Sequence, residues 1–227
     1  MFKSKTRDIV IPQAEHAKLS GILAYNWGNE EFDKPAFDFN SFVEGVKYHD
    51  IGYGEYDNSP LGELTLEQWA DLTFKGTEIS FDNPVVDIVT KLHLKRLLGD
   101  DNVKIRGEIL NNIEKSVEER LPETDNSLEE FMWADRITDF CDWVSFNFCL
   151  EKDFEDKVEV HARRISFVKT ELKFHTNLAG EIVVDPWPFS AESINGTIIA
   201  YYKNGYPEEL KPVSKEYYIK KKKNPRQ

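Results

Sequence analysis

Near Lys157 the spacing of apolar residues along this 227-residue chain changes from about four to two. Before that point, apolar residues recur at the three- and four-residue intervals of amphipathic helices. After it, apolar and charged residues alternate, as at Val158, Val160 and Ala162, which is typical of strands with one buried face. A chain with this order of patterns is expected to place helices first and strands last, and therefore to belong to the α+β class.

Six helices are predicted in the first two-thirds of the chain. By residue number they cover 12–27, 41–54, 65–75, a segment from 83 on, 101–121 and 127–150. Ser41 and Ser127 suit N-caps, and Pro84 suits a first turn. About five strands follow, within 158–162, 172–174, 182–184, 197–202 and 217–219. Short connections favour an antiparallel sheet packed on the helices. The predicted organisation is a helical core over residues 1–155, a sheet region of the same domain over 156–219 and a flexible basic tail over 220–227.

The composition excludes several classes of function. Acidic residues outnumber basic ones by 41 to 29, and five of the basic residues lie in the last eight positions. The body of the chain therefore repels a phosphate backbone, and no nucleic-acid partner is expected. No segment reaches the ~18 apolar residues of a membrane span, and the N-terminus lacks a signal-peptide pattern. Cys141 and Cys149 are too far apart along one predicted helix to form a disulfide. The chain is expected to be cytoplasmic, with no membrane partner.

Four predicted helices each place a metal-capable side chain on an apolar face. These side chains are His16, His49 with Asp50 beside it, His93, and the trio Asp135, Asp139 and Asp142. A single histidine on an apolar face is usually a satisfied core residue, but three on separate helices are less ordinary. A carboxylate in an apolar stripe is tolerated when it is paired or bound to a metal. For Asp135 and Asp139, partial exposure or neutralisation by Arg136, Arg163 or Arg164 is the competing explanation.

The order His16…His49-Asp50…Asp142 resembles that of the HD-domain superfamily of helical metal-dependent proteins. A closer resemblance is to an uncharacterised family within or near it, a domain of unknown function. Five segments carry it: IPQAEHAKLSGILAYNWG at 11–28, HDIGYGEYDNSP at 49–60, NPVVDIVTKLH at 83–93, DWVSFNFC at 142–149 and DPWPF at 185–189. The resemblance implies a mainly helical HD-domain-like core with a C-terminal antiparallel β-sheet packed on it.

The resemblance also implies which residues hold a metal. His16, His49, Asp50 and Asp142 are the implied ligands, and His93 is brought to the same cavity as a further candidate. Mixed imidazole and carboxylate ligands suit a divalent transition metal such as Mn, Fe, Ni, Co or Zn.

The leading functional hypothesis is a metal-dependent hydrolase that acts on a small molecule, such as a phosphoester, through a metal-activated water. Asp50 or His93 is expected to take or relay the proton. Gln13, Tyr53 and Tyr56 are expected to line the substrate cleft. Tyr53 stands where many HD phosphohydrolases carry the lysine of HD-x-G-K, so that phosphate anchor is missing. Its absence, with the acidic body, argues against a polyphosphate substrate.

Two alternatives stay open. An HD-type iron-dependent oxygenase uses a similar ligand set, although binuclear HD proteins have two histidines between the HD pair and the last Asp, where this chain has only His93. A non-catalytic small-molecule binding protein, in which a metal ties four helices together, is the other. The oligomeric state is left open by the sequence, and a dimer is one option.

Overall fold

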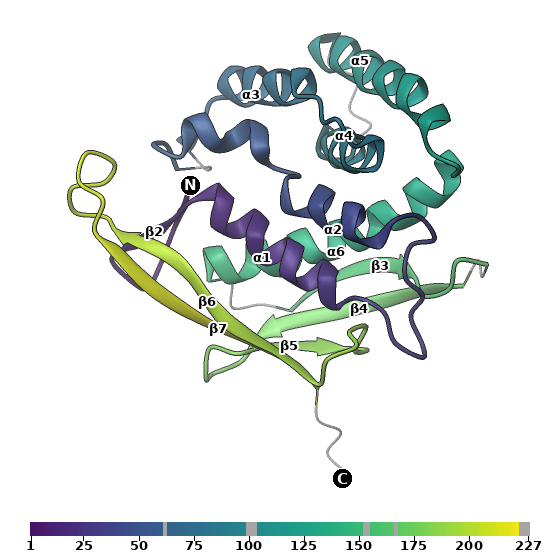
Figure 1. Cartoon of the computed structure of the whole chain (residues 1–227). Coiled ribbons are helices and arrows are strands. Elements are labelled where there is room, and N and C mark those ends of the chain that lie inside the picture. The colour runs from purple at the N-terminus through teal and green to yellow at the C-terminus, as the bar shows by residue number, and fades with distance from the viewer. Residues whose placement is uncertain (61–62, 99–103, 152–154, 166–167, 223–227) are drawn as a thin grey trace.

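A curved sheet lies along one side of the molecule, and the helices are stacked against it (Figure 1). The computed structural model describes residues 1–60, 63–98, 104–151, 155–165 and 168–222. The sheet has seven strands in the order β1-β2-β6-β7-β5-β4-β3. The strands are β1 (Phe2–Lys3), β2 (Ile9–Ile11), β3 (Asp156–His161), β4 (Lys169–Thr176), β5 (Ile182–Asp185), β6 (Ser193–Tyr202) and β7 (Pro212–Lys221).

The predicted helices form at the predicted places. They are α1 (Gln13–Asn26), α2 (Phe39–Lys47), α3 (Leu66–Glu78), α4 (Pro84–Leu98), α5 (Lys104–Arg120) and α6 (Leu128–Leu150), with 3-10 helices η1 (Ile51–Tyr56) and η3 (Leu121–Glu123). Ser127 and Thr65 each close a capping box at the start of α6 and α3. The prediction for α2 is wrong at both ends. Asp38 rather than Ser41 accepts the capping hydrogen bond, and the helix ends at Lys47, before the glycines.

The expected architecture, a mainly helical HD-domain-like core with a C-terminal antiparallel sheet, is wrong. The sheet also takes in the two strands at the N-terminus, since β2 pairs with β6. It is mixed, because β5 and β7 run parallel. The molecule is therefore an α+β fold around a seven-stranded mixed sheet. The two N-terminal strands escaped prediction because segments of two and three residues carry no readable period.

The expected limits of the regions also shift. Residues 1–155 are not helical throughout, since β1 and β2 belong to the sheet. Lys220 and Lys221 end β7, and the backbone N–H of Lys222 donates to Val184. The expected flexible tail over 220–227 therefore includes ordered residues at its start, and residues 223–227 lie outside the described part. In the described part of the chain, every helix is too short or too polar to cross a membrane.

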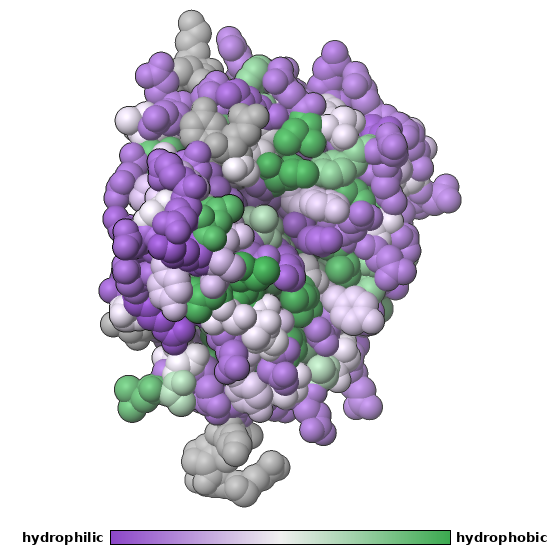
Figure 2. Space-filling view, turned by 60° about the vertical axis from the view of Figure 1, so that its left-hand side comes forward, coloured by the Kyte–Doolittle hydropathy of each residue, from purple (hydrophilic) through white to green (hydrophobic). Residues whose placement is uncertain are grey.

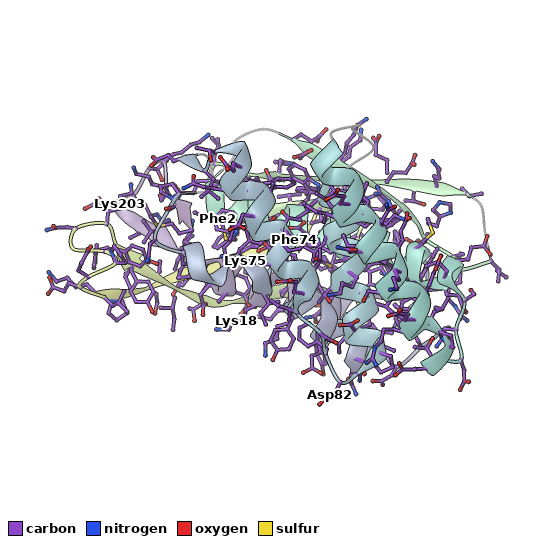
Figure 3. The ribbon with its side chains drawn as sticks, turned by 90° about the horizontal axis from the view of Figure 1, so that it is seen from above. Phe2, Lys18, Phe74, Lys75, Asp82 and Lys203 are labelled. Atoms are coloured by element: carbon purple, nitrogen blue, oxygen red, sulfur yellow. The ribbon has the colours of Figure 1, made fainter. Side chains whose placement is uncertain are left out.

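The helices form three layers over the sheet. α1 and α6 contact the sheet directly, while α2 and α4 pack above them, and α3 and α5 pack on α4. Seen from above, α3 with its labelled Phe74 and Lys75 lies nearest the viewer together with α5 (Figure 3). Phe140 of α6 shows how the inner layer is anchored, since its ring lies 5.7 Å from that of Phe174 in β4. α1 is buried on most of its circumference because the sheet and helices surround it.

Two glycines, Gly45 and Gly52, let the backbone on either side of His49-Asp50 approach the neighbouring helices closely. A Cβ at Gly52 would lie 2.7 Å from the Cα of Gly76 in α3, and one at Gly45 would lie 2.7 Å from the Cβ of Val89 in α4. Side chains at these positions would push α3 and α4 outward. Gly52, two residues after Asp50, thus sets the distance between the His49-Asp50 turn and α3.

Candidate metal centre

Five metal-capable side chains from four parts of the fold meet beneath α4. His16 comes from α1, His49 and Asp50 from the turn after α2, His93 from α4 and Asp142 from α6. All five are buried, with at most 8% of each residue exposed. Their ligand atoms form two overlapping groups of three, His16, His49 and Asp142, and His49, Asp50 and His93, within 4.8 Å of one another. The convergence expected from the sequence is present.

His49 presents an unused nitrogen to this cluster. Its Nδ1 lies 2.6 Å from the carbonyl oxygen of Val46, which can only accept, so Nδ1 carries the proton. This contact also satisfies a carbonyl at the C-terminal end of α2. In the neutral ring, Nε2 is then a lone pair, and it has no hydrogen-bond partner among the described residues. It faces carboxylate oxygens of Asp50 and Asp142, each at 3.5 Å.

His16 is held in the same tautomer. The Ser145 hydroxyl donates to the His16 carbonyl at 2.8 Å, so its oxygen accepts from His16 Nδ1 at 2.9 Å. His16 Nε2 therefore also points at the carboxylates, 3.1 Å from Asp142 Oδ1 and 3.4 Å from Asp50 Oδ2. Fixing of the outer nitrogen by a backbone or side-chain oxygen is how proteins orient metal-binding histidines.

The electrostatics show that the cluster attracts positive charge. Burial by itself lowers the pKa of His16, but hydrogen bonds to Asp142 and Asp50 outweigh it and raise that pKa well above its ordinary value. Burial raises the pKa of Asp142, and the hydrogen bond from His16, with His49 close by, more than reverses this. The pKa of Asp50 is lowered in the same way, against burial, by His49 and His16. A proton on His16 and a metal cation bound by His16, His49, Asp50 and Asp142 would therefore occupy the same position and compete for it.

The donor set fits a transition metal. The histidine Nε2 and carboxylate atoms that face one another are 3.1 to 3.5 Å apart. A tetrahedral ion with bonds of about 2.1 Å has edges of about 3.4 Å, which match these four histidine–carboxylate separations, while Asp50 and Asp142 belong to separate groups of three. Two imidazoles and two carboxylates are the mixture that Zn, Fe, Mn, Co and Ni accept, whereas Mg and Ca prefer oxygen alone.

His93 differs from the other two histidines because both of its ring nitrogens have protein partners. The Arg96 guanidinium donates to Nδ1 at 3.0 Å, so the ring proton is on Nε2, which donates to Asp50 Oδ1 at 3.1 Å. Burial is the largest cause that lowers the pKa of His93, which favours the neutral ring. In this arrangement His93 supports Asp50 from outside the donor set.

The other two aspartates of α6, Asp135 and Asp139, are neutralised by arginines. Arg96 donates through Nε to Asp135 at 3.0 Å and through Nη1 to Asp139 at 2.8 Å, and Arg136 lies 2.8 Å from Asp139. Of the three arginines proposed for this role, Arg136 takes part. Arg96 was missed, although its spacing of three from His93 puts it on the same face of α4.

A pocket of about 210 Å³ lies directly against the cluster. Its lining includes His16, Asp50, His93, Arg96 and Asp142, together with Phe2, Gln13, Tyr53, Trp69, Leu97, Trp143 and Phe146. Gln13 and Tyr53 were expected there. The side chain of Tyr56, also expected, lies outside the described part. The aromatic residues Phe2, Trp69, Trp143 and Phe146 were not predicted to line the pocket. Phe2 and Trp69 come from segments that carry no other site residue.

Comparison with known proteins identifies the family. A family model described as "Protein of unknown function (DUF3891)" matches residues 1–202. The chain belongs to this family. Searches of curated proteins and of solved structures find no match. The expected resemblance to an uncharacterised family is thereby confirmed at that level.

The DUF3891 match includes every residue of the cluster and the pocket and stops before β7. It also includes DPWPF, whose Trp187 packs on Phe189 with ring centroids 4.8 Å apart and donates to the Ala191 carbonyl. Trp187 therefore belongs to the hydrophobic core and is not among the side chains that line the pocket.

Proposed function

We propose that this chain is a metal-dependent hydrolase that acts on a small molecule in the pocket beside the His/Asp cluster. The observation that carries the proposal is the unpartnered Nε2 of His49, a buried lone pair that faces two carboxylates. Lone pairs crowded in this way repel one another unless a proton or a cation lies between them. A divalent transition metal held by His16, His49, Asp50 and Asp142 relieves that repulsion.

A metal ion held by these residues would supply Lewis-acid activation of water and of the oxygen under attack. The protein supplies the base. Asp50 takes the proton of the attacking water at Oδ1, and His93 holds that oxygen in place through its Nε2–H. Arg96 fixes the tautomer of His93 by occupying Nδ1. Arg96 and His93 are therefore positioning residues, and Asp50 is the catalytic one.

The pocket favours catalysis over a purely structural metal. Structural metal sites are closed by protein ligands, whereas catalytic sites leave a position open to water or substrate. Here Asp50, Asp142 and His16 themselves line the pocket, so the cluster has an open side. The order His16…His49-Asp50…Asp142 adds a motif-level likeness to HD-type metalloproteins, several of which are hydrolases.

Metal loading and hydrolysis should be measured on the same preparations. Protein purified without chelator is analysed for metals, then supplied with Zn²⁺, Mn²⁺ or Fe²⁺ and assayed with 4-nitrophenyl acetate and methyl 4-nitrophenyl phosphate. We expect close to one ion per chain and metal-dependent release of nitrophenol. His49→Ala should abolish both, while His175→Ala, which alters a histidine in β4 away from the cluster, should change neither.

Two results would contradict the proposal. A wild-type protein that neither carries nor takes up a transition metal refutes the site itself. A metal-loaded protein without hydrolysis, but with oxygen uptake in its Fe²⁺ form, would replace the hydrolase with the oxygenase alternative.

A further inference from the structure

The walls of the pocket are unusually aromatic for a site built around charged groups. Six of its twelve lining side chains are aromatic or leucine, and they come from β1, η1, α3, α4 and α6. Trp143 and Phe146 of α6 form one wall, with ring centroids 5.4 Å apart at 69°. Phe2 continues it, 5.5 Å from Phe146. Flat apolar walls of this kind bind a ring by burial and by face or edge contacts.

The volume of the pocket matches one ring. Pockets for drug-sized ligands run from about 300 Å³ upward. This pocket, at about 210 Å³, is smaller and must also hold the group that reacts at the cluster. A single ring with a short reactive substituent fits such a space.

The charges around the pocket limit the ligand further. Four carboxylates and two guanidiniums gather near the pocket: Asp142, Asp135 and Asp139 face Arg96 or Arg136, and Asp50 faces His93. The group carries two net negative charges, and a divalent cation brings it to zero. The charge of Arg96 is already matched by its two partners on α6. Among the described residues that line the pocket, no positive charge is left over for a phosphomonoester dianion or a polyphosphate.

Gln13 adds a polar requirement. It is 3% exposed and lines the pocket, and its Oε1 has no hydrogen-bond partner among the described residues. A buried amide oxygen without a partner costs free energy, which a donor on a bound ligand recovers. The amide nitrogen can take its place by rotation, so the side chain can also serve an acceptor.

We propose that the substrate is a small molecule with one aromatic ring, at most one negative charge, and a polar group bonded to Gln13. Its ring lies on Trp143 and Phe146, and its reactive group points at Asp50 and Asp142. The proposal deepens the hydrolase assignment and rests on it for the direction of the reactive group, but the ring preference can be tested without any metal.

The test uses two matched pairs of probes. Benzohydroxamate and acetohydroxamate share one metal-binding group and differ only in the ring, and they are titrated into Zn²⁺-loaded protein by calorimetry. Benzamide and acetamide need no metal and are compared on metal-free protein by ligand-observed NMR. Burial of a ring makes binding of benzohydroxamate at least about tenfold tighter than that of acetohydroxamate. Benzamide should bind measurably and acetamide should not.

Variants link the preference to the pocket. Trp143 is 37% exposed, so Trp143→Ala is compatible with folding. It should remove most of the tenfold difference between the hydroxamates, and Trp143→Phe should restore part of it. Met132→Ala, on an exposed position of the same helix outside the pocket, should leave the difference unchanged. Gln13→Leu should weaken benzamide binding by about fivefold, because one hydrogen bond is lost.

The outcomes separate the two proposals. Equal binding of both hydroxamates, with no benzamide binding, overturns the ring preference and leaves the metal site standing. Benzamide binding that depends on Trp143, with benzohydroxamate bound no more tightly than benzamide and acetohydroxamate not bound, supports the ring preference and overturns the metal site. A ring preference that persists in Trp143→Ala shows that the ring binds elsewhere and overturns the proposal.

Discussion

Replacing Asp142 by Asn separates the proposed metal ligand from its acidic neighbours on α6. Asn keeps the shape of the side chain but removes the charge that faces His16 at 3.1 Å and His49 at 3.5 Å. Asp139, one helical turn earlier, is the matched control, because its carboxylate is committed to Arg96 and Arg136. We expect Asp142→Asn to weaken metal binding by at least about a hundredfold, since changes in the second shell alone cost ten- to a hundredfold. Asp139→Asn should weaken it by about tenfold or less.

These affinities translate into melting temperatures. At a Co²⁺ concentration about one hundred times the wild-type Kd, binding stabilises the folded state by about 2.7 kcal/mol. With an unfolding entropy of about 2.1 cal/mol/K per residue, the 227 residues give a rise in Tm of about 6 °C. A hundredfold weaker site keeps about 0.4 kcal/mol, or about 1 °C. A tenfold weaker site keeps about 1.4 kcal/mol, or about 3 °C.

The assay compares each variant with itself, with and without Co²⁺, so a change in the stability of the metal-free protein cancels. Calorimetry gives Tm, and the visible absorption of Co²⁺ reports independently on its ligands. The reasoning fails if Asp142→Asn keeps the full rise. It fails equally if Asp139→Asn loses as much as Asp142→Asn, because the acidic face of α6 would then act as a whole.

Three further predictions concern stability and use urea unfolding. The pKa of Glu151 is lowered to about 2 because hydrogen bonds from Ser4 and Thr6, with the nearby charge of Lys215, outweigh its burial. Glu151→Gln should therefore cost about 2 kcal/mol at pH 7, after allowance for solvent screening. Since the folded-state pKa is depressed, this difference should shrink as the pH falls below about 4.5, and a constant difference would contradict it. Arg96→Met leaves the carboxylates on α6 without their main partner and should destabilise the fold by about 3 kcal/mol, with a neutral effect as the contrary result. Ser127→Ala removes the capping box of α6 and should cost about 1 kcal/mol, measured against the exposed Met132→Ala.

The sequence by itself determined the helices and the metal-capable residues. Three- and four-residue spacing is a local property, so α1, α4 and α6 could be read with their buried faces. Histidines on those faces had to point inward, which brought His16 and His93 toward the same interior. The end of α2, just before His49-Asp50, was predicted less accurately. It depends on the packing of α2 beneath α4, where Gly45 lies against Val89.

Only the tertiary structure decided how the strands pair and what surrounds the cluster. The pairing of β2 with β6 and the parallel pairing of β5 with β7 join segments far apart in the chain, and no local pattern encodes such pairings. The hydrogen-bond partners of His93 and His49 were also decided by the tertiary structure. The bond from Arg96 to His93 and the bond from His49 to Val46 depend on distances that are set by folding. Residue types fix which atoms can bind a metal or a proton. The packing of four helices fixes which of those atoms are left without any other partner.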